Sequence, residues 1–307
     1  MENQRGIGLE IEYQIVDIDT NKPVSKIQNI PSIVYIQNQI QNRFSSHAAN
    51  VHAEQLSILC EIVSDVKDTM VQSYFQISEI ANIIDQKILS NFNLKLLPNP
   101  VVNSNFEIVP ASLDPNSRSF QLFNQWGADQ ILKTAICSMQ INDSYVMPVY
   151  IGADDQVNHL LKFFRVYQEN ISKYLTLNTT QTFQNQNRIQ ISEDLLWNVK
   201  HVSFEYYGFE KNDLMIPTKV ETNTDILKWM LAHNQIHVPE NKLLHIETET
   251  ILKSISPKNI HGHLKVKYDP KDLYNTWILE HRFLDASTSL ENAQRFHEVF
   301  YHDLEIS

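Results

Sequence analysis

Glycine is scarce in this sequence, with 6 residues among 307. Neither the GxxxxGKS/T pattern of P-loop proteins nor the GxGxxG pattern of dinucleotide-binding folds occurs, so these two ways of holding a nucleotide are excluded. Uninterrupted apolar runs stay below the ~18 residues that a membrane-spanning helix needs. The first predicted strand follows Met1–Arg5 directly, and we therefore expect no signal peptide.

Positive charge and cysteine are also in short supply. The 25 Lys and Arg residues are outnumbered by 36 Asp and Glu residues, and the net charge of −11 argues against nucleic acid or an anionic membrane as a partner. The two cysteines, Cys60 and Cys137, fall on apolar strand faces and are typical of reduced core residues. We expect a cytoplasmic protein with a single α+β domain over residues 1–307.

Acidic side chains alternate with apolar ones in the first predicted strand, Gly6–Ile15. The apolar residues share one face, and Gly8, Glu10, Glu12 and Gln14 share the other. Two carboxylates that point from a rigid face into one space repel each other unless a cation lies between them. Taken alone, the pattern also fits an amphipathic strand whose outer face is hydrated.

A second predicted strand, His52–Val63, places another acid on a partly dry face. Its even-numbered residues from 56 to 62 form an apolar face, whereas Glu61 lies on the other face beside Leu59 and Val63. A carboxylate is costly in such surroundings unless it is paired or bound to metal. The pattern therefore favours a cation partner for Glu61.

Two later segments repeat this design. Polar residues lie on one side of Ala135–Asn142 (Ser138, Gln140 and Asn142) and of Trp277–Asp285 (Glu280 and Arg282). Together the four segments predict an α+β fold, with a curved, mainly antiparallel sheet, a concave active-site face, and helices packed on the outer face. The concave side would carry five acids, two amides and an arginine.

Helical spacing of apolar residues in the connecting segments predicts four helices, at 71–89, 156–175, 225–233 and 287–304. The prolines between residues 94 and 119 predict a long irregular connection there.

The four strand motifs are also the residues by which the chain resembles a known family. It is similar to the glutamate–cysteine ligases and related carboxylate–amine ligases, which share the glutamine synthetase-like catalytic fold. The family's Gly-x-Glu-x-Glu strand is matched by Gly8–Glu12, and its spaced pair of acids by Glu54 and Glu61. Its third strand, which reads Gln-x-Asn or His-x-His/Asn, is matched by Gln140–Asn142, and its Glu-x-Arg-x-x-Asp strand by Glu280–Asp285. The matches occur in the family's order over nearly the whole chain.

This resemblance implies an ATP-dependent enzyme that joins the carboxylate of glutamate, or a similar carboxylate, to an amine through an acyl-phosphate. Magnesium would neutralise the phosphate charge through oxygen ligands, and the implied ligands are Glu10, Glu12, Glu54, Glu61 and Glu280. Gln140 or Asn142 would supply a neutral oxygen donor or bind the substrate carboxylate. Arg282 would stabilise the phosphoryl group during transfer.

Two functions stay open. In one, the protein is a ligase whose partners are small molecules: ATP, the carboxylate, and cysteine or another amine. In the other, a non-catalytic relative kept the site and binds nucleotide or amino acid as a regulatory or binding protein. Retention of all five acids and Arg282 favours the ligase, because a decayed site has little reason to bury like charges. Whether the chain forms a homo-oligomer is left open.

Overall fold

The computed structural model describes residues 4–99, 106–126, 137–146, 264–268 and 276–307, together with residues 162, 163, 165–167, 169, 170, 173 and 174. The predicted α+β fold with a mainly antiparallel sheet is confirmed. The curvature of the sheet, its concave face and its relation to the glutamine synthetase fold stay predictions. The single catalytic domain over residues 1–307 also stays a prediction.

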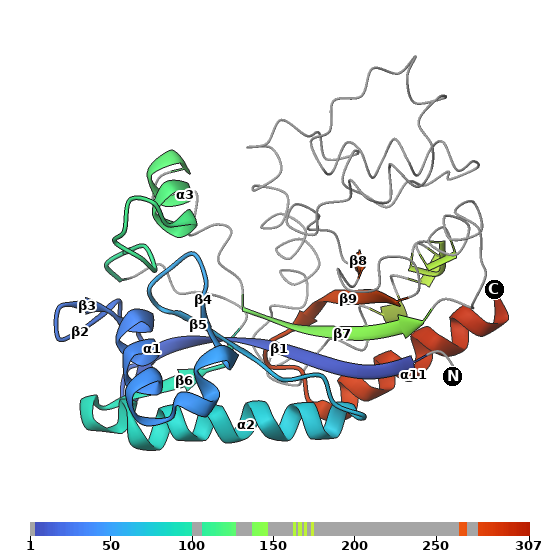
Figure 1. Ribbon diagram of the computed structural model, residues 1–307, viewed down its shortest axis with the longest axis horizontal. Coiled ribbons are helices and arrows are strands. Elements are labelled where there is room, and N and C mark those ends of the chain that lie inside the picture. The colour runs from blue at the N-terminus through green and yellow to red at the C-terminus, as the bar shows by residue number, and fades with distance from the viewer. Residues whose placement is uncertain are drawn as a thin grey trace, which may run out of the picture. The chain divides into compact units, whose positions relative to one another are not determined.

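The main sheet is organised around β1 (Gln4–Asp17), the longest described strand (Figure 1). Its strand order is β4-β5-β1-β7-β9-β8, and β6 pairs with β1 as well. The partner strands are β4 (Val51–Ala53), β5 (Leu59–Val63), β6 (Leu94–Leu97), β7 (Ser138–Val146), β8 (Leu264–Tyr268) and β9 (Thr276–Asp285). Two short strands, β2 (Lys26–Ile27) and β3 (Ile30–Pro31), form a separate antiparallel pair.

The register of β1 and β5 sets the position of the acids. The two strands are antiparallel, with Glu10 opposite Val63 and Glu12 opposite Glu61. Because residues directly opposite in an antiparallel pair share one face, the side chains of Glu12 and Glu61 lie on the same face of the sheet. On its other edge β5 pairs with β4, where His52 lies opposite Glu61.

The described α-helices are α1 (Ser32–Arg43), α2 (Met70–Lys87), α3 (Arg118–Trp126) and α11 (Leu290–Ile306), and short 3-10 helices cover Ser45–Asn50 and Leu89–Phe92. α2 begins at a capping box, in which the side chains of Thr69 and Gln72 each accept a hydrogen bond from the other residue's backbone. Its apolar stripe packs against β5 and β6, and Figure 1 shows the helix running along these strands.

The chain divides into two compact units. The acidic unit contains Ile7–Gln140 and Leu284–Leu290, and the aromatic unit contains Met1–Gly6, Ile141–Phe283 and Glu291–Ser307. Fully buried aliphatic side chains such as Leu9, Ile11 and Ile77 form the core of the acidic unit. The core of the aromatic unit is built from rings, namely Phe163, Tyr167, Tyr174, Phe296 and Phe300.

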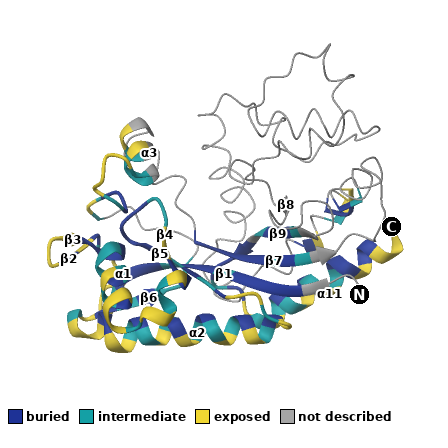
Figure 2. Ribbon diagram, viewed as in Figure 1, coloured by how far each residue is buried: buried dark blue, intermediate teal, exposed yellow. Residues whose placement is uncertain are grey.

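Burial contradicts the alternative of a hydrated outer face for β1. Glu12 and Gln14, which lie on the polar face, are only 7% and 2% exposed. Figure 2 shows β1 dark blue over most of its length, whereas the outer face of α2 is yellow. Glu12 therefore lies in dry surroundings, whereas Glu10 is half-buried.

The structure confirms several of the strands and helices that the sequence predicts. β1, β9, α2 and α11 confirm the predicted strands and helices, with α11 beginning at Leu290 instead of Ser287. The described residues between 162 and 174 are helical, as predicted. Helix 225–233 lies outside the described residues, as do residues 135 and 136 of the third strand.

Two predictions were wrong. His52–Val63 is not one strand, because the chain turns between β4 and β5 and the two pair as a hairpin. The connection 94–119 is not wholly irregular either, since β6 extends the sheet beside β1 and α3 begins at Arg118.

Candidate metal and phosphate site

Three of the predicted metal ligands meet in the acidic unit. One carboxylate oxygen each from Glu12, Glu54 and Glu61 lies within 4.8 Å of the others. Glu12 comes from β1, Glu61 from the opposing position on β5, and Glu54 from the turn between β4 and β5. The hairpin of β4 and β5 was not predicted from the sequence. Its turn folds Glu54 back toward Glu61 and therefore explains the cluster.

The cluster is electrostatically strained. Burial raises the pKa of Glu61 well above its usual range, and the charges of Glu54, Glu10 and Glu12 raise it further. A hydrogen bond with Glu10 acts in the same direction. Like charges raise one another's pKa when they share a dry space, so this site stabilises either a proton or a cation between its carboxylates.

Neutral donors from β7 hold Glu12 in place. The backbone N–H of Ser138 donates to Glu12 Oε2 at 2.7 Å, and the Ser138 hydroxyl donates to the same oxygen at 3.2 Å. Gln140 Nε2 donates to Glu12 Oε1 at 3.4 Å. Gln140 is 2% exposed, and within the described part of the chain its Oε1 atom has no hydrogen-bond partner. This oxygen is therefore available to a ligand at the cluster.

Backbone hydrogen bonds with two distant segments hold the turn that carries Glu54. Residues 55 and 57 pair with the segment around Pro110, through Ala111 N to Gln55 O at 3.1 Å and Ser57 N to Val109 O at 3.0 Å. The start of α1 adds a bond from Ile33 N to Ser57 O at 2.9 Å. Glu54 consequently projects from a braced turn instead of a free loop.

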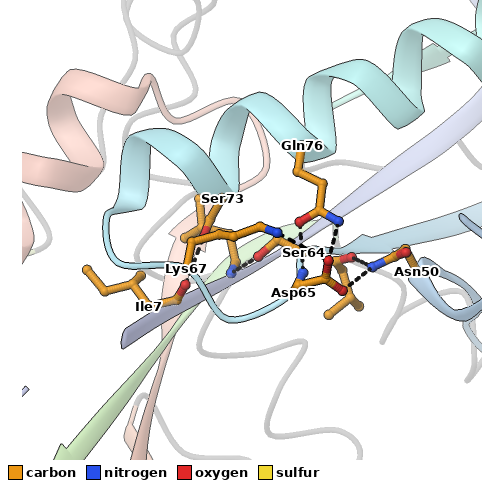
Figure 3. A network of polar contacts seen from close by, with 9 residues as sticks. Ile7, Asn50, Ser64, Asp65, Lys67, Ser73 and Gln76 are labelled. Carbon is orange, nitrogen blue, oxygen red and sulfur yellow. Dashed lines mark hydrogen bonds and ion pairs between the residues drawn. The ribbon is translucent and has the colours of Figure 1, made fainter. Parts of the chain in front are cut away.

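A second polar network braces the end of β5 beside Glu61 (Figure 3). The backbone N–H of Leu9 donates to Ser64 Oγ at 2.9 Å, which ties β1 to the residue after β5. Asp65 accepts hydrogen bonds from Asn50 at 3.2 Å and Gln76 at 2.8 Å, so the same corner is fixed to α2. Ser73 of α2 also donates to the carbonyl of Ile7 at 2.7 Å. These bonds limit the relative motion of β1 and β5, which carry Glu12 and Glu61.

Both cysteines are buried and free, which agrees with their prediction as core residues. Burial raises the pKa of Cys60 and Cys137, and neighbouring acids raise both further, Glu61 in the case of Cys60 and Glu12 in the case of Cys137. The thiolate is the nucleophilic form of cysteine. Neither side chain is therefore suited to covalent catalysis.

Glu280 and Arg282 lie in the aromatic unit, in alternate positions of β9. Arg282 Nη1 donates to Glu280 Oε1, and the Glu280 side chain is completely buried whereas Arg282 is 19% exposed. Asn142, in the same unit, is half-buried on β7. The convergence of these residues with Glu12, Glu54 and Glu61 stays a prediction.

The geometry of the acidic cluster fits magnesium. Mg²⁺ takes oxygen ligands at about 2.0–2.1 Å in an octahedron, so two ligands of one ion lie roughly 3–4 Å apart. Three carboxylate oxygens within 4.8 Å of one another meet this requirement with small adjustments. The unused Gln140 Oε1 is a neutral oxygen of the same chemical type. Glu12, Glu54 and Glu61 are thus the residues that would hold the ion.

One group of buried residues was missed by sequence reasoning. Asp143 lies on β7, and both of its carboxylate oxygens contact imidazoles, those of His281 and His297. His281 stands between Glu280 and Arg282, and strand alternation turns it to the opposite face. The signal available in the sequence was a polar residue, His281, between the apolar Leu279 and Phe283 on that face.

Similarity to known proteins was found at the level of structure. No family model and no curated protein matches the sequence. A bifunctional glutathione synthetase from Pasteurella multocida matches 98% of this chain at 14% identity and a TM-score of 0.59. A glutamate–cysteine ligase from Francisella tularensis, solved with AMP, matches 57% of the chain at 13% identity and a TM-score of 0.38. The ligase PafA, solved with the ubiquitin-like protein Pup, matches 99% at 9% identity and a TM-score of 0.42.

The chain corresponds to only part of each of these structures. This chain spans 39% of the glutathione synthetase, 34% of the glutamate–cysteine ligase and 46% of the PafA structure. Among the described residues, no helix combines the length and apolar character needed to cross a bilayer. What is shown is a fold shared with part of the bifunctional glutathione synthetase.

Proposed function

We propose that the protein is an ATP- and magnesium-dependent ligase that joins the carboxylate of glutamate, or a similar carboxylate, to an amine. The observation that carries this proposal is the group of Glu12, Glu54 and Glu61, whose carboxylate oxygens lie within 4.8 Å of one another. Burying like charges is unfavourable unless a cation compensates them. The fold shared with a bifunctional glutathione synthetase supports the same class of reaction.

The proposed reaction has two steps. A carboxylate oxygen of the acid substrate attacks the γ-phosphorus of ATP, and ADP leaves with the electrons of the broken P–O bond. The amine nitrogen then attacks the acyl carbon, loses a proton, and inorganic phosphate leaves. Bound magnesium supplies charge neutralisation for the phosphates.

Particular residues would serve these steps. Glu12, Glu54 and Glu61 hold the ion, with Glu10 beside them and Glu280 as a further ligand. Arg282 donates to the phosphoryl oxygens through its planar guanidinium, which suits spread charge at fixed positions. Gln140 and Asn142 bind the substrate carboxylate, and the unused Oε1 of Gln140 can alternatively complete the metal site. The resemblance favours glutamate as the acid and leaves cysteine and other amines open.

The test is ADP release by the purified protein with magnesium, ATP and glutamate, across a panel of amines that includes cysteine. We expect amine-dependent ADP release in the wild-type protein and its loss in Glu61→Gln. Glu79→Gln is the matched control, because Glu79 is an exposed acid on α2 that lies outside the cluster. Binding of ATP without ADP release under every condition would favour the alternative, a non-catalytic nucleotide-binding protein.

A further inference from the structure

A buried polar network lies behind the strand that carries Glu280 and Arg282. We call it the Asp143 network, and its members are Asp143 on β7, His281 on β9, His297 on α11 and Tyr167. All four belong to the aromatic unit, as do Glu280 and Arg282. Asp143, His281 and Tyr167 are fully buried, and the His297 side chain is 12% exposed.

The hydrogen bonds of this network form a continuous chain. His297 Nε2 lies 2.9 Å from Asp143 Oδ1, and His281 Nε2 lies 3.0 Å from Asp143 Oδ2. The hydroxyl of Tyr167 lies 2.7 Å from His281 Nδ1. Both nitrogens of His281 and both oxygens of Asp143 are thus engaged, which leaves neither side chain a second orientation of equal energy.

The protonation states are consistent with this geometry. Burial raises the pKa of Tyr167 well above its usual range, so its hydroxyl keeps the proton and donates to His281 Nδ1. His281 then carries its own proton on Nε2 and donates to Asp143. Burial alone would raise the pKa of Asp143, but the charge of His297 and hydrogen bonds from both imidazoles lower it to about 2. Asp143 is therefore an ionised, doubly bonded acceptor.

Aromatic rings surround His281 and fix its plane. Its ring centroid lies 4.8 Å from that of Phe300 and 5.2 Å from that of Phe296, both edge-to-face, and 5.7 Å from the stacked ring of Tyr167. Both phenylalanines come from α11 and are fully buried. The imidazole is consequently held by hydrogen bonds at its two nitrogens and by packing on its faces.

Two other roles for the network are excluded by its burial and geometry. Tyr167, His281 and Asp143 are arranged like a nucleophile, base and orienting acid, yet all three are completely buried, so a substrate cannot reach the tyrosine oxygen. A metal site is not indicated either. Within the described residues, the only three side chains whose ligand atoms are close enough to share a metal ion are Glu12, Glu54 and Glu61.

We infer that the Asp143 network positions β9, so that Asp143 and His281 act as positioning residues for Glu280 and Arg282. His281 is the residue between them, and its side chain is held on the opposite face of the strand. Locking His281 fixes the backbone on both sides of it, and with it the directions in which the acid and the guanidinium leave the strand. The inference rests on the proposed function, which assigns those two side chains to the ion and the transferred phosphoryl group.

The test compares Asp143→Asn with a matched control, Asp303→Asn. Asp303 is also a buried acid in the same unit, and it accepts hydrogen bonds from Lys173 Nζ at 2.8 Å and Tyr174 at 3.0 Å, neither of which belongs to β9. Asp143→Asn keeps the volume but presents an amide N–H to one of the two imidazole donors. We expect kcat to fall about 100-fold in Asp143→Asn while ATP affinity is largely kept, because a small misplacement harms the transition state most. Asp303→Asn is expected to lower the melting temperature without this loss of kcat.

A second measurement does not depend on catalysis. Amide hydrogen exchange of β9, after correction for the change in global stability measured for each variant, should accelerate in Asp143→Asn and not in Asp303→Asn. Tyr167→Phe is the milder variant, removing only the hydroxyl at His281 Nδ1, and it decides the matter if Asp143→Asn does not fold. Equal kcat losses in Asp143→Asn and Asp303→Asn, or unchanged β9 exchange in folded Asp143→Asn and Tyr167→Phe, would overturn the inference. A wild-type protein without ligase activity would refute the proposed function, while the exchange data would still decide whether Asp143 holds β9.

Discussion

Arg282 donates a hydrogen bond to the carboxylate of Glu280, two residues earlier in β9. The acid is completely buried and the guanidinium mostly so, which strengthens their attraction relative to water. The proposed function asks Glu280 to bind magnesium and Arg282 to contact phosphate. The ion pair therefore has to loosen when the substrates bind, and the two side chains should respond differently to substitution.

We expect Arg282→Lys to impair turnover far more than ATP binding. Lysine keeps the charge but loses the planar fork, so ground-state attraction to the phosphates should largely survive. The charge that develops in the transition state needs a donor at a fixed position, and losing one such donor typically slows a reaction about 100- to 1000-fold. ATP affinity and single-turnover ADP formation measure the two effects separately.

Glu280→Gln provides the contrast. It removes a ligand charge, so magnesium affinity itself should weaken, with saturating magnesium restoring part of the activity. If Arg282→Lys turned over at nearly the wild-type rate, Arg282 would be only a structural partner of Glu280, and its catalytic role would be wrong.

Glu61→Gln should stabilise the protein when divalent metal is absent. The folded-state pKa of Glu61 is raised, so between its usual value of about 4.3 and the folded value the native state binds a proton that the unfolded state lacks. Wild-type stability therefore falls as pH rises through that window. Urea unfolding in a chelator should show Glu61→Gln more stable than wild type near pH 7, with a smaller difference near pH 4. The opposite order near neutral pH would show that Glu61 has a compensating partner.

The spacing of apolar residues correctly predicted the strands and helices that bury one continuous face. β1, β9 and α2 were found in this way, because their buried positions repeat at the spacing of a strand or a helix. The break between β4 and β5 could not be predicted from the same rule, since the alternation continues through the turn. What ends the strand is hydrogen bonding of residues 55–58 to distant segments, among them Val109 and Ile33.

Only part of the candidate site could be predicted from the sequence. Glu61 was recognisable as an acid on a partly apolar strand face, and its pairing with Glu12 follows from the register. The Asp143 network was not recognisable, because its contacts join residues 138 and 154 positions apart. The role of a buried histidine next to a motif can be inferred only when its hydrogen-bond partners are known.

Magnesium with ATP should raise the melting temperature of the wild-type protein. A ligand that binds only the folded state adds about 2.7 kcal/mol of stability at a hundredfold excess over its dissociation constant. Here the cation also relieves repulsion among Glu12, Glu54 and Glu61. The melt is best recorded with magnesium alone, ATP alone and both together, and an unchanged transition in all three would contradict the metal site.

Cys60 and Cys137 should not react with a thiol reagent such as DTNB in the native protein. Both are buried, and their pKa values are raised, so thiolate is scarce and shielded. Two equivalents should react after unfolding in denaturant. Rapid labelling of the folded protein would place a cysteine in an accessible site and contradict this assignment.

The Asp143 carboxylate should make a measurable contribution to the pH dependence of stability. Its pKa is lowered to about 2 in the folded protein, below its usual value of about 3.9. At pH values well above about 3.9, the Asp143 carboxyl is ionised in both the folded and the unfolded state, so its full contribution to stability is present. As pH falls through about 3.9 toward about 2, the unfolded carboxylate takes up a proton first, and the contribution of about 3 kcal/mol is lost. The stability difference between wild type and Asp143→Asn should accordingly shrink on acidification from about pH 5 to about pH 2. Glu79→Gln, at an exposed position, reports the general acid destabilisation against which this change is measured. A constant difference over the whole range would mean that folding does not shift the pKa of Asp143. A difference that grows on acidification would mean that Asp143 is protonated in the folded protein, so that the imidazoles of His281 and His297 are bonded to a carboxylic acid instead of a carboxylate.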